Sequence, residues 1–357
     1  MAGTLSEERV MRHVRRWSCV RFDGLMVIAI LVVKAVTATA QSTIPDGEWH
    51  AFGRDSANTK YSPLDQITAA NFTDLEIAWR WGSLSQAVVD SYERIQPRGF
   101  VATSLMVDGL VYTVTALGQV AAVNAGTGEQ VWDYDPRIYD YLDRPPNMGW
   151  HHRGISYWDD AESNDARIFI ASHDLRLVAL SARTGRMYPD FGLDGYVDLG
   201  SDEGFERAVD RSRMTYSSPV TIVGDTVIVG SIIQDTNLWT VDETTPGHVR
   251  AYDARTGEMK WVFRTVPQGD DFGADSWGNE SWRYSGHSNV WSYMAADEEL
   301  GHVYFATGTP SNDWYGGKRP GDNLFAESIV AVDVETGERV WHFQAIHHGL
   351  WDWDFPT

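Results

Sequence analysis

"AVNAGTGEQVW", residues 122–132, decides the fold of this chain, because close copies of it recur along the sequence. The copies are "AYDARTGEMKW" at 251–261 and "AVDVETGERVW" at 331–341. A weaker copy, "ALSARTGRMYP" at 179–189, has Pro189 in place of the tryptophan, and "NFTDLEIAW" at 71–79 is similar to the end of an earlier unit. Self-similarity at intervals of several tens of residues is typical of proteins built from repeated supersecondary units.

Each copy has the chemistry of a strand, a tight turn and a second strand. Alternating apolar residues precede the copies, as in 111–115 and 303–306, and predict strands. The polar residue at the third position can bind the local backbone, and the glycine after threonine provides the positive φ that a hairpin needs. The following strand carries the tryptophan, whose flat face can dock on a neighbouring sheet.

These units predict an all-β fold, a β-propeller of four-stranded blades joined by docked tryptophans. The copies amount to four or five blades, and the longest insertions follow the second and third Thr-Gly pairs. Loops that carry function on such a scaffold gather on one face, around the central axis. The insertions are therefore where we look for a site.

Composition supports a large folded protein and excludes some partners. The chain has 357 residues, is 43% hydrophobic and contains 16 tryptophans, so it can form a large core. Its net charge of −21 argues against nucleic acid as a partner. The only cysteine, Cys19, precedes residue 41, so residues 41–357 contain no disulfide and no cysteine metal site.

The first forty residues are typical of an export signal. Basic residues, Arg12 to Arg21, precede an apolar run at 25–33, and Ala38-Thr39-Ala40 provides small residues for cleavage. We expect a signal peptide at 1–40, a propeller domain at 41–357 and a periplasmic protein, with peripheral association with the inner membrane as a further option. An uncleaved single anchor is the alternative, although the apolar run is short for a membrane span.

Five motifs in this order closely resemble the pyrroloquinoline quinone (PQQ)-dependent alcohol and glucose dehydrogenases. They are "DGEWHAFGRD" at 46–55, "NTKYSPLDQI" at 58–67, "SNVWS" at 288–292, "RPGDN" at 319–323 and "HHGLWDWD" at 347–354. The resemblance implies an eight-bladed propeller, of which about half to two-thirds would be present here. We therefore expect the domain to be incomplete at its C-terminus, and the chain alone to be inactive.

The resemblance also implies a chemistry. Hydride would pass from an alcohol or aldose carbon to PQQ, with Ca²⁺ polarising the cofactor, and electrons would leave to ubiquinone or cytochrome c. Asp322 in "RPGDN" matches the catalytic base of the family. Proline and glycine fix a tight turn that can present this carboxylate, and the alternative is a turn-capping aspartate.

Four residues match positions that contact the cofactor. Trp277 matches the floor on which the quinone stacks, the alternative being one more tryptophan between blades. Arg153 matches an arginine that contacts the cofactor, and Asn323 follows the base. His348 lies where relatives place a lysine or arginine, although an ordinary loop histidine is equally consistent with the sequence.

Three oxygen donors match the Ca²⁺ site of the family. They are Asn289, Asp235 and Asp322. Ca²⁺ prefers hard oxygen ligands such as carboxylates and amides. Asp235 is also consistent with a solvated loop aspartate, because a long insertion follows it.

Two departures from the family pattern bear on the branch. Val101 stands where many relatives carry an acidic cofactor contact, and Asn147-Met148 replaces the adjacent cysteine pair of some alcohol-oxidising members. The second departure favours the glucose-like, broad-substrate branch over the methanol dehydrogenases. The alternative function is a non-catalytic propeller scaffold, similar to those of outer-membrane assembly, which would need neither Asp322 nor Asn289.

Overall fold

The computed structural model describes residues 44–83, 86–93, 95–97, 99–142, 149–234 and 243–355. They belong to one compact unit, Ser42–Thr357. The expected signal peptide, Asp235 and the Asn147-Met148 pair lie outside the described residues. Among the described residues, no helix is long and apolar enough to cross a membrane.

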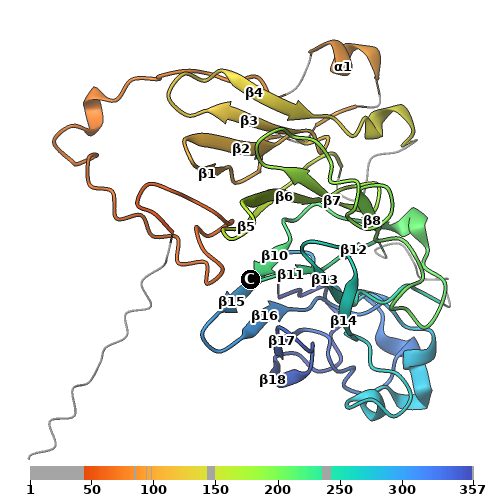
Figure 1. The fold of residues 1–357 in the computed structure, drawn as a ribbon. Coiled ribbons are helices and arrows are strands. Elements are labelled where there is room, and N and C mark those ends of the chain that lie inside the picture. The colour runs from red at the N-terminus through yellow and green to blue at the C-terminus, as the bar shows by residue number, and fades with distance from the viewer. Residues whose placement is uncertain are drawn as a thin grey trace, which may run out of the picture. The chain divides into compact units, whose positions relative to one another are not determined.

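Four sheets of four antiparallel strands follow one another along the chain (Figure 1), which confirms the predicted all-β, partial-propeller fold. The first sheet contains β1 (Leu105–Val107), β2 (Leu110–Val114), β3 (Val120–Asn124) and β4 (Gln130–Tyr134), and the second contains β5 (Ser156–Asp160), β6 (Asp165–Ala171), β7 (Arg176–Ser181) and β8 (Tyr196–Asp198). The third contains β10 (Thr221–Val223), β11 (Thr226–Val229), β13 (Val249–Asp253) and β14 (Met259–Phe263), and the fourth contains β15 (Ala295–Asp297), β16 (His302–Ala306), β17 (Ser328–Asp333) and β18 (Arg339–Gln344).

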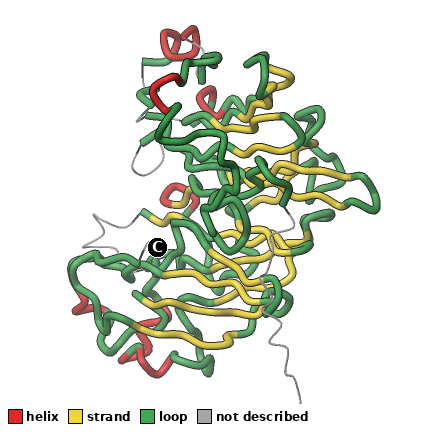
Figure 2. The backbone as a smooth tube through the Cα atoms, turned by 90° about the vertical axis from the view of Figure 1, so that its left-hand side faces the viewer, coloured by secondary structure: helices red, strands yellow, loops and turns green. Residues whose placement is uncertain are grey.

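The remaining described elements are short and lie in the connections, where Figure 2 shows the helical turns among loops. A two-stranded sheet pairs β9 (Met214–Thr215) with β12 (Ile232–Ile233). The helical segments are α1 (Gln86–Ser91) and the 3₁₀ turns η1 (Phe72–Asp74), η2 (Ile138–Asp140), η3 (Arg211–Arg213), η4 (Ala274–Ser276), η5 (Gly278–Arg283) and η6 (Gly316–Lys318). Four of these turns, η3 to η6, lie in the two long insertions that follow the second and third Thr-Gly pairs.

In the first, third and fourth sheets the repeat forms the hairpin between the last two strands, as its local chemistry predicts. The Oδ1 atom of Asn124 accepts hydrogen bonds from the backbone N–H groups of Gly126 and Thr127, at 3.0 and 2.9 Å. Asp253 and Asp333 make the same pair of bonds in their own repeats. The Thr-Gly glycines of all four repeats have φ between 67° and 76°. These contacts are local, so the same sequence gives the same turn each time.

The tryptophans dock each unit on the next one, also as predicted. The Nε1–H of Trp132 donates to the carbonyl oxygen of Ala182 at 2.9 Å, and that of Trp261 donates to the carbonyl oxygen of Val334 at 2.7 Å. Each ring covers the glycine of that next repeat, Gly185 and Gly337 respectively, so closely that a Cβ atom there would collide with it. One short motif therefore supplies both a hairpin and a joint between sheets.

The copy that lacks the tryptophan uses an arginine instead. Arg167 on β6 donates from Nη1 to the carbonyl oxygens of Ala254 and Arg255, at 3.0 and 2.7 Å. Ala254 holds the same place in its repeat as Ala182 and Val334 do in theirs. The guanidinium lies 4.0 Å from the ring centre of Tyr188, which supports it as a cation–π contact. The repeat that has Pro189 in place of tryptophan is thus joined to the next unit by Arg167, a residue outside the repeat.

The core lies between consecutive sheets. Three clusters of buried apolar residues fill the spaces between the first and second, the second and third, and the third and fourth sheets. Trp132 and Trp261 are 8% and 7% exposed, whereas Trp341 on β18 is 42% exposed. The last repeat of this chain therefore presents its tryptophan without a docking partner among the described residues.

Candidate functional site

The loop that carries Asp322 is fixed against Trp277. The indole Nε1–H of Trp277 donates to the carbonyl oxygen of Leu324 at 2.5 Å, and the N–H of Gly278 donates to the carbonyl oxygen of Pro320 at 2.6 Å. Trp277 is only 1% exposed, so both faces of its ring are covered. A cofactor could stack on this ring only after one face is uncovered. The stacking role of Trp277 stays a prediction.

Asp322 is exposed, and its neighbours are held by hydrogen bonds. Asn323 is fully buried: its Oδ1 accepts from Nη1 of Arg319 at 2.9 Å, and its Nδ2 donates to the carbonyl oxygen of Arg319 at 2.9 Å. Both ends of the amide are thus used to hold the turn. Asn323 therefore fixes the loop here, and its expected contact with cofactor or substrate stays a prediction.

His348 lies over the same turn. Its ring nitrogen Nδ1 is 2.8 Å from the carbonyl oxygen of Gly321, and its backbone N–H donates to the carbonyl oxygen of Asp322 at 3.2 Å. The structure therefore brings together three separate stretches of the sequence, at Trp277, at Asp322-Asn323 and at His348.

Asn289 presents a buried amide oxygen that has no hydrogen-bond donor among the described residues. Asn289 is 1% exposed, and its Nδ2 donates to the carbonyl oxygen of Ser231 at 2.7 Å. Its Oδ1 has no hydrogen-bond partner in the part of the chain that the structure describes. Gly247 packs directly on Asn289, where a side chain would collide with it. A buried oxygen without a donor is costly, and a hard cation would satisfy it.

Of the two other expected metal ligands, only Asp322 lies in the part of the chain that the structure describes. Asp235 lies outside the described residues, and Asp322 accepts hydrogen bonds from His348 and Gln344 through its backbone carbonyl oxygen. Over the described residues, no group of three or more His, Cys, Asp or Glu side chains is arranged to hold a metal. The metal roles of these three residues stay predictions.

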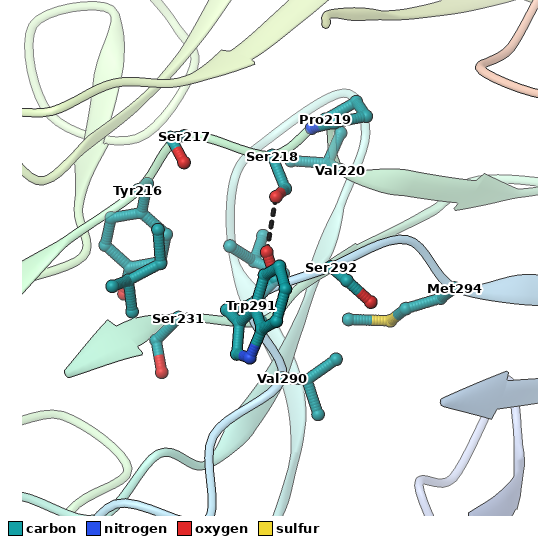
Figure 3. A pocket seen from close by; sticks show the side chains of 13 residues that line it. Tyr216, Ser217, Ser218, Pro219, Val220, Ser231, Val290, Trp291, Ser292 and Met294 are labelled. Carbon is teal, nitrogen blue, oxygen red and sulfur yellow. Dashed lines mark hydrogen bonds between the residues drawn. The ribbon is translucent and has the colours of Figure 1, made fainter. Parts of the chain in front are cut away.

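Figure 3 shows a small pocket lined by residues on both sides of the chain next to Asn289, such as Ser231 and Val290. Arg153 contacts two other residues that line it. Its Nη1 donates to the hydroxyl oxygen of Ser217 at 2.5 Å, and the guanidinium lies 5.2 Å from the ring centre of Trp291. Ser218, which lines the pocket, donates to the carbonyl oxygen of Trp291 at 2.5 Å. Burial lowers the pKa of Arg153, because its positive charge is unfavourable away from water. An anion bound at this place would offset that cost and would therefore be favoured.

Three further residues of this region make contacts that the sequence does not reveal. Asp354 accepts from the indole Nε1–H of Trp291 through Oδ2 and from the backbone N–H of Thr309 through Oδ1, both at 2.7 Å. The hydroxyl of Thr309 donates to Oε1 of Glu327 at 3.0 Å, and Glu327 is fully buried. Asp354 belongs to a motif that the sequence marks, "HHGLWDWD", but its partners depend on contacts between distant segments.

The family model for the β-propeller domain of PQQ-dependent glucose, ethanol and alcohol dehydrogenases matches residues 49–357. The chain belongs to this family. Quinoprotein glucose dehydrogenase A of Acinetobacter calcoaceticus is 30% identical to it over 90% of this chain and 40% of that protein. The quinohemoprotein alcohol dehydrogenase ADH IIB of Pseudomonas putida is 32% identical over 89% of this chain and 42% of that protein.

Solved structures agree with this membership. The quinohemoprotein alcohol dehydrogenase of Comamonas testosteroni superimposes with a TM-score of 0.70 at 29% identity, over 87% of this chain and 43% of that one. A europium-containing methanol dehydrogenase shares the fold with a TM-score of 0.65 at 23% identity. The chain is thus closer to the alcohol and glucose dehydrogenases than to the methanol dehydrogenase, as its sequence predicted, and it spans about two-fifths of the curated relatives' length.

Proposed function

We propose that this chain contributes the PQQ-binding part of a dehydrogenase that oxidises an alcohol or an aldose sugar. The observation that supports it best is the buried Oδ1 of Asn289, which lacks a donor among the described residues. It lies in a chain whose family consists of PQQ-dependent dehydrogenases. A non-catalytic scaffold would have no use for a buried amide oxygen kept without a hydrogen bond.

In this proposal Asn289, Asp235 and Asp322 hold Ca²⁺ through oxygen atoms. An amide and two carboxylates match the preference of this hard cation. The amide of Asn289 is already fixed by its bond to Ser231, so its oxygen would be presented with little further ordering.

Four residues would hold and orient the cofactor. Arg153 supplies a planar cation, in a half-buried place that favours an anionic group. Trp277 would supply a flat apolar face, and His348 and Asn323 would border it, since both contact the loop next to Trp277. PQQ, when bound, supplies the acceptor for the hydride.

Asp322 would take the proton of the substrate hydroxyl. Its carboxylate is exposed, on a turn held by Arg319, Asn323 and His348 through the backbone. A carboxylate on a fixed turn can reach a bound substrate without reorganising the loop. The electrons would then pass to ubiquinone or cytochrome c, and the protein would work in the periplasm.

The test uses the full-length protein in a dye-linked dehydrogenase assay over a panel of sugars and alcohols, with and without added PQQ and Ca²⁺. We expect turnover that requires both, and at least a ~100-fold loss of kcat in Asp322→Asn with PQQ still bound. Asp270→Asn, at an exposed aspartate, is the matched control and should keep normal turnover. If PQQ does not bind and no substrate is oxidised, the scaffold alternative is correct.

A further inference from the structure

Glu327 is a fully buried acidic residue that the proposed function does not use. It lies just after the "RPGDN" loop and directly before β17, at 0% exposure, with φ of 47°. A buried carboxyl group is costly unless other groups bind it. Its position therefore depends on its contacts.

Those contacts come from two sides. On one side Oε1 accepts the hydroxyl hydrogen of Thr309 at 3.0 Å. On the other side the carboxyl group lies against the backbone of Gly349, where no Cβ atom would fit. The carbonyl oxygen of Gly349 in turn accepts from Nη2 of Arg319 at 2.6 Å.

Each side leads to one half of the candidate site. Thr309 donates its backbone N–H to Asp354, which accepts the indole N–H of Trp291 beside Arg153. Arg319 donates to the side chain of Asn323, the residue after Asp322. His348, which precedes Gly349, binds the backbone carbonyl oxygen of Asp322.

We propose that Glu327 is a positioning residue that joins the Asp322 loop to the Trp291–Asp354 side of the candidate site. This inference rests on the proposed function for its catalytic meaning, but the join itself is a property of the fold. Two charged groups act on the carboxyl group, Arg319 favouring its ionised form and Asp354 opposing it.

The charge state of Glu327 gives the join a pH dependence. Burial raises the pKa of Glu327 to about 7, although the Thr309 bond and Arg319 oppose this shift. The carboxyl group is therefore neutral in the closed structure at mildly acidic pH. When the loop opens and the group meets water, its pKa returns to the ordinary range, so opening becomes easier as the pH rises towards 7.

Hydrogen exchange measured on the full-length protein tests the join without any assumption about activity. The peptides to follow cover residues 316–325 and 346–355, at pH 5.5 and pH 8, corrected for intrinsic exchange. In the wild type we expect protection to fall at least about tenfold between these pH values. Glu327→Gln imitates the neutral carboxyl group and should show no such fall, whereas Glu338→Gln, at an exposed glutamate, should behave as the wild type does.

Turnover provides the second measurement. In the holoenzyme, kcat should decline as the pH rises through about 7, and Glu327→Gln should remove that decline while retaining activity. A merely structural glutamate would lower kcat at every pH and leave the profile unchanged. If exchange of both peptides is the same in Glu327→Gln and wild type, or if the kcat profile keeps its decline, the proposal is wrong. A pH-dependent exchange difference in a protein without turnover would support the join and refute only the dehydrogenase function.

Discussion

Gly337→Ala should destabilise the protein through a collision with a single ring, that of Trp261. A Cβ atom at Gly337 would lie 2.6 Å from Cδ2 of Trp261, and the residue has φ of 71°. A left-handed conformation costs a non-glycine residue about 1–2 kcal/mol. Overpacking against a buried side chain adds about 1–3 kcal/mol. We expect the free energy of unfolding to fall by about 2–5 kcal/mol in total.

The matched control lies in the same sheet. Gly301 has φ of 65° and open space where its Cβ atom would be. Gly301→Ala should therefore show the backbone cost alone, about 1–2 kcal/mol. The difference between the two variants isolates the contact between glycine and tryptophan.

Urea unfolding of the full-length protein, followed by circular dichroism, measures both losses. Trp261→Ala removes the ring and should cost about 3–5 kcal/mol alone. In the double variant the alanine at 337 should then add only its backbone cost, so the two substitutions would be non-additive by about 1–3 kcal/mol. Equal losses in Gly337→Ala and Gly301→Ala, or strict additivity with Trp261→Ala, would refute tryptophan docking as the joint between these sheets.

Three further outcomes follow from the structure. Arg167→Met should lower the free energy of unfolding by about 2 kcal/mol or more, seen as a lower urea midpoint, because the carbonyl oxygens of Ala254 and Arg255 lose a buried charged donor. An unchanged midpoint would show that the arginine does not replace the missing tryptophan. Asn289→Leu should weaken Ca²⁺ binding at least about tenfold by calorimetry while the circular dichroism spectrum stays unchanged, and undiminished affinity would exclude Asn289 as a ligand. Burial lowers the pKa of His152 to about 4 and that of His173 to about 3. Between about pH 6.5 and about pH 4 the unfolded state therefore binds protons that the folded state does not, so the free energy of unfolding should fall as the pH drops through this range. His173→Gln should make this fall less steep, and an unchanged pH dependence in that variant would contradict the assignment.

The sequence predicted the sheets well because the information that makes them is local. In three of the repeats the third residue, such as Asn124, and the glycine of the Thr-Gly pair fold the turn by contacts within a few residues. The alternating apolar runs before them place the strands, and the strands at 110–114 and 302–306 confirm the two predicted at 111–115 and 303–306. Even the docking of Trp132 could be anticipated, since a large aromatic side chain at a fixed place in a repeat needs a surface to cover.

The candidate site could be predicted only in part. The motifs marked Asp322, Trp277 and Asn289 as residues to examine, and the structure shows what holds them. The sequence could not show that the amide nitrogen of Asn289 is hydrogen-bonded while its oxygen has no donor among the described residues. The sequence also could not show that the ring of Trp277 is covered, because its burial depends on the segment around Leu324, about fifty residues away.

By itself, then, the sequence determined the repeat, its hairpins and the class of scaffold. Tertiary structure alone decided that Arg167 replaces a missing tryptophan and that Glu327 lies between Thr309 and Gly349. The physical reason is the range of the interactions. Turn and strand preferences act between neighbours in the chain, whereas a buried charge is positioned by groups that only folding brings together.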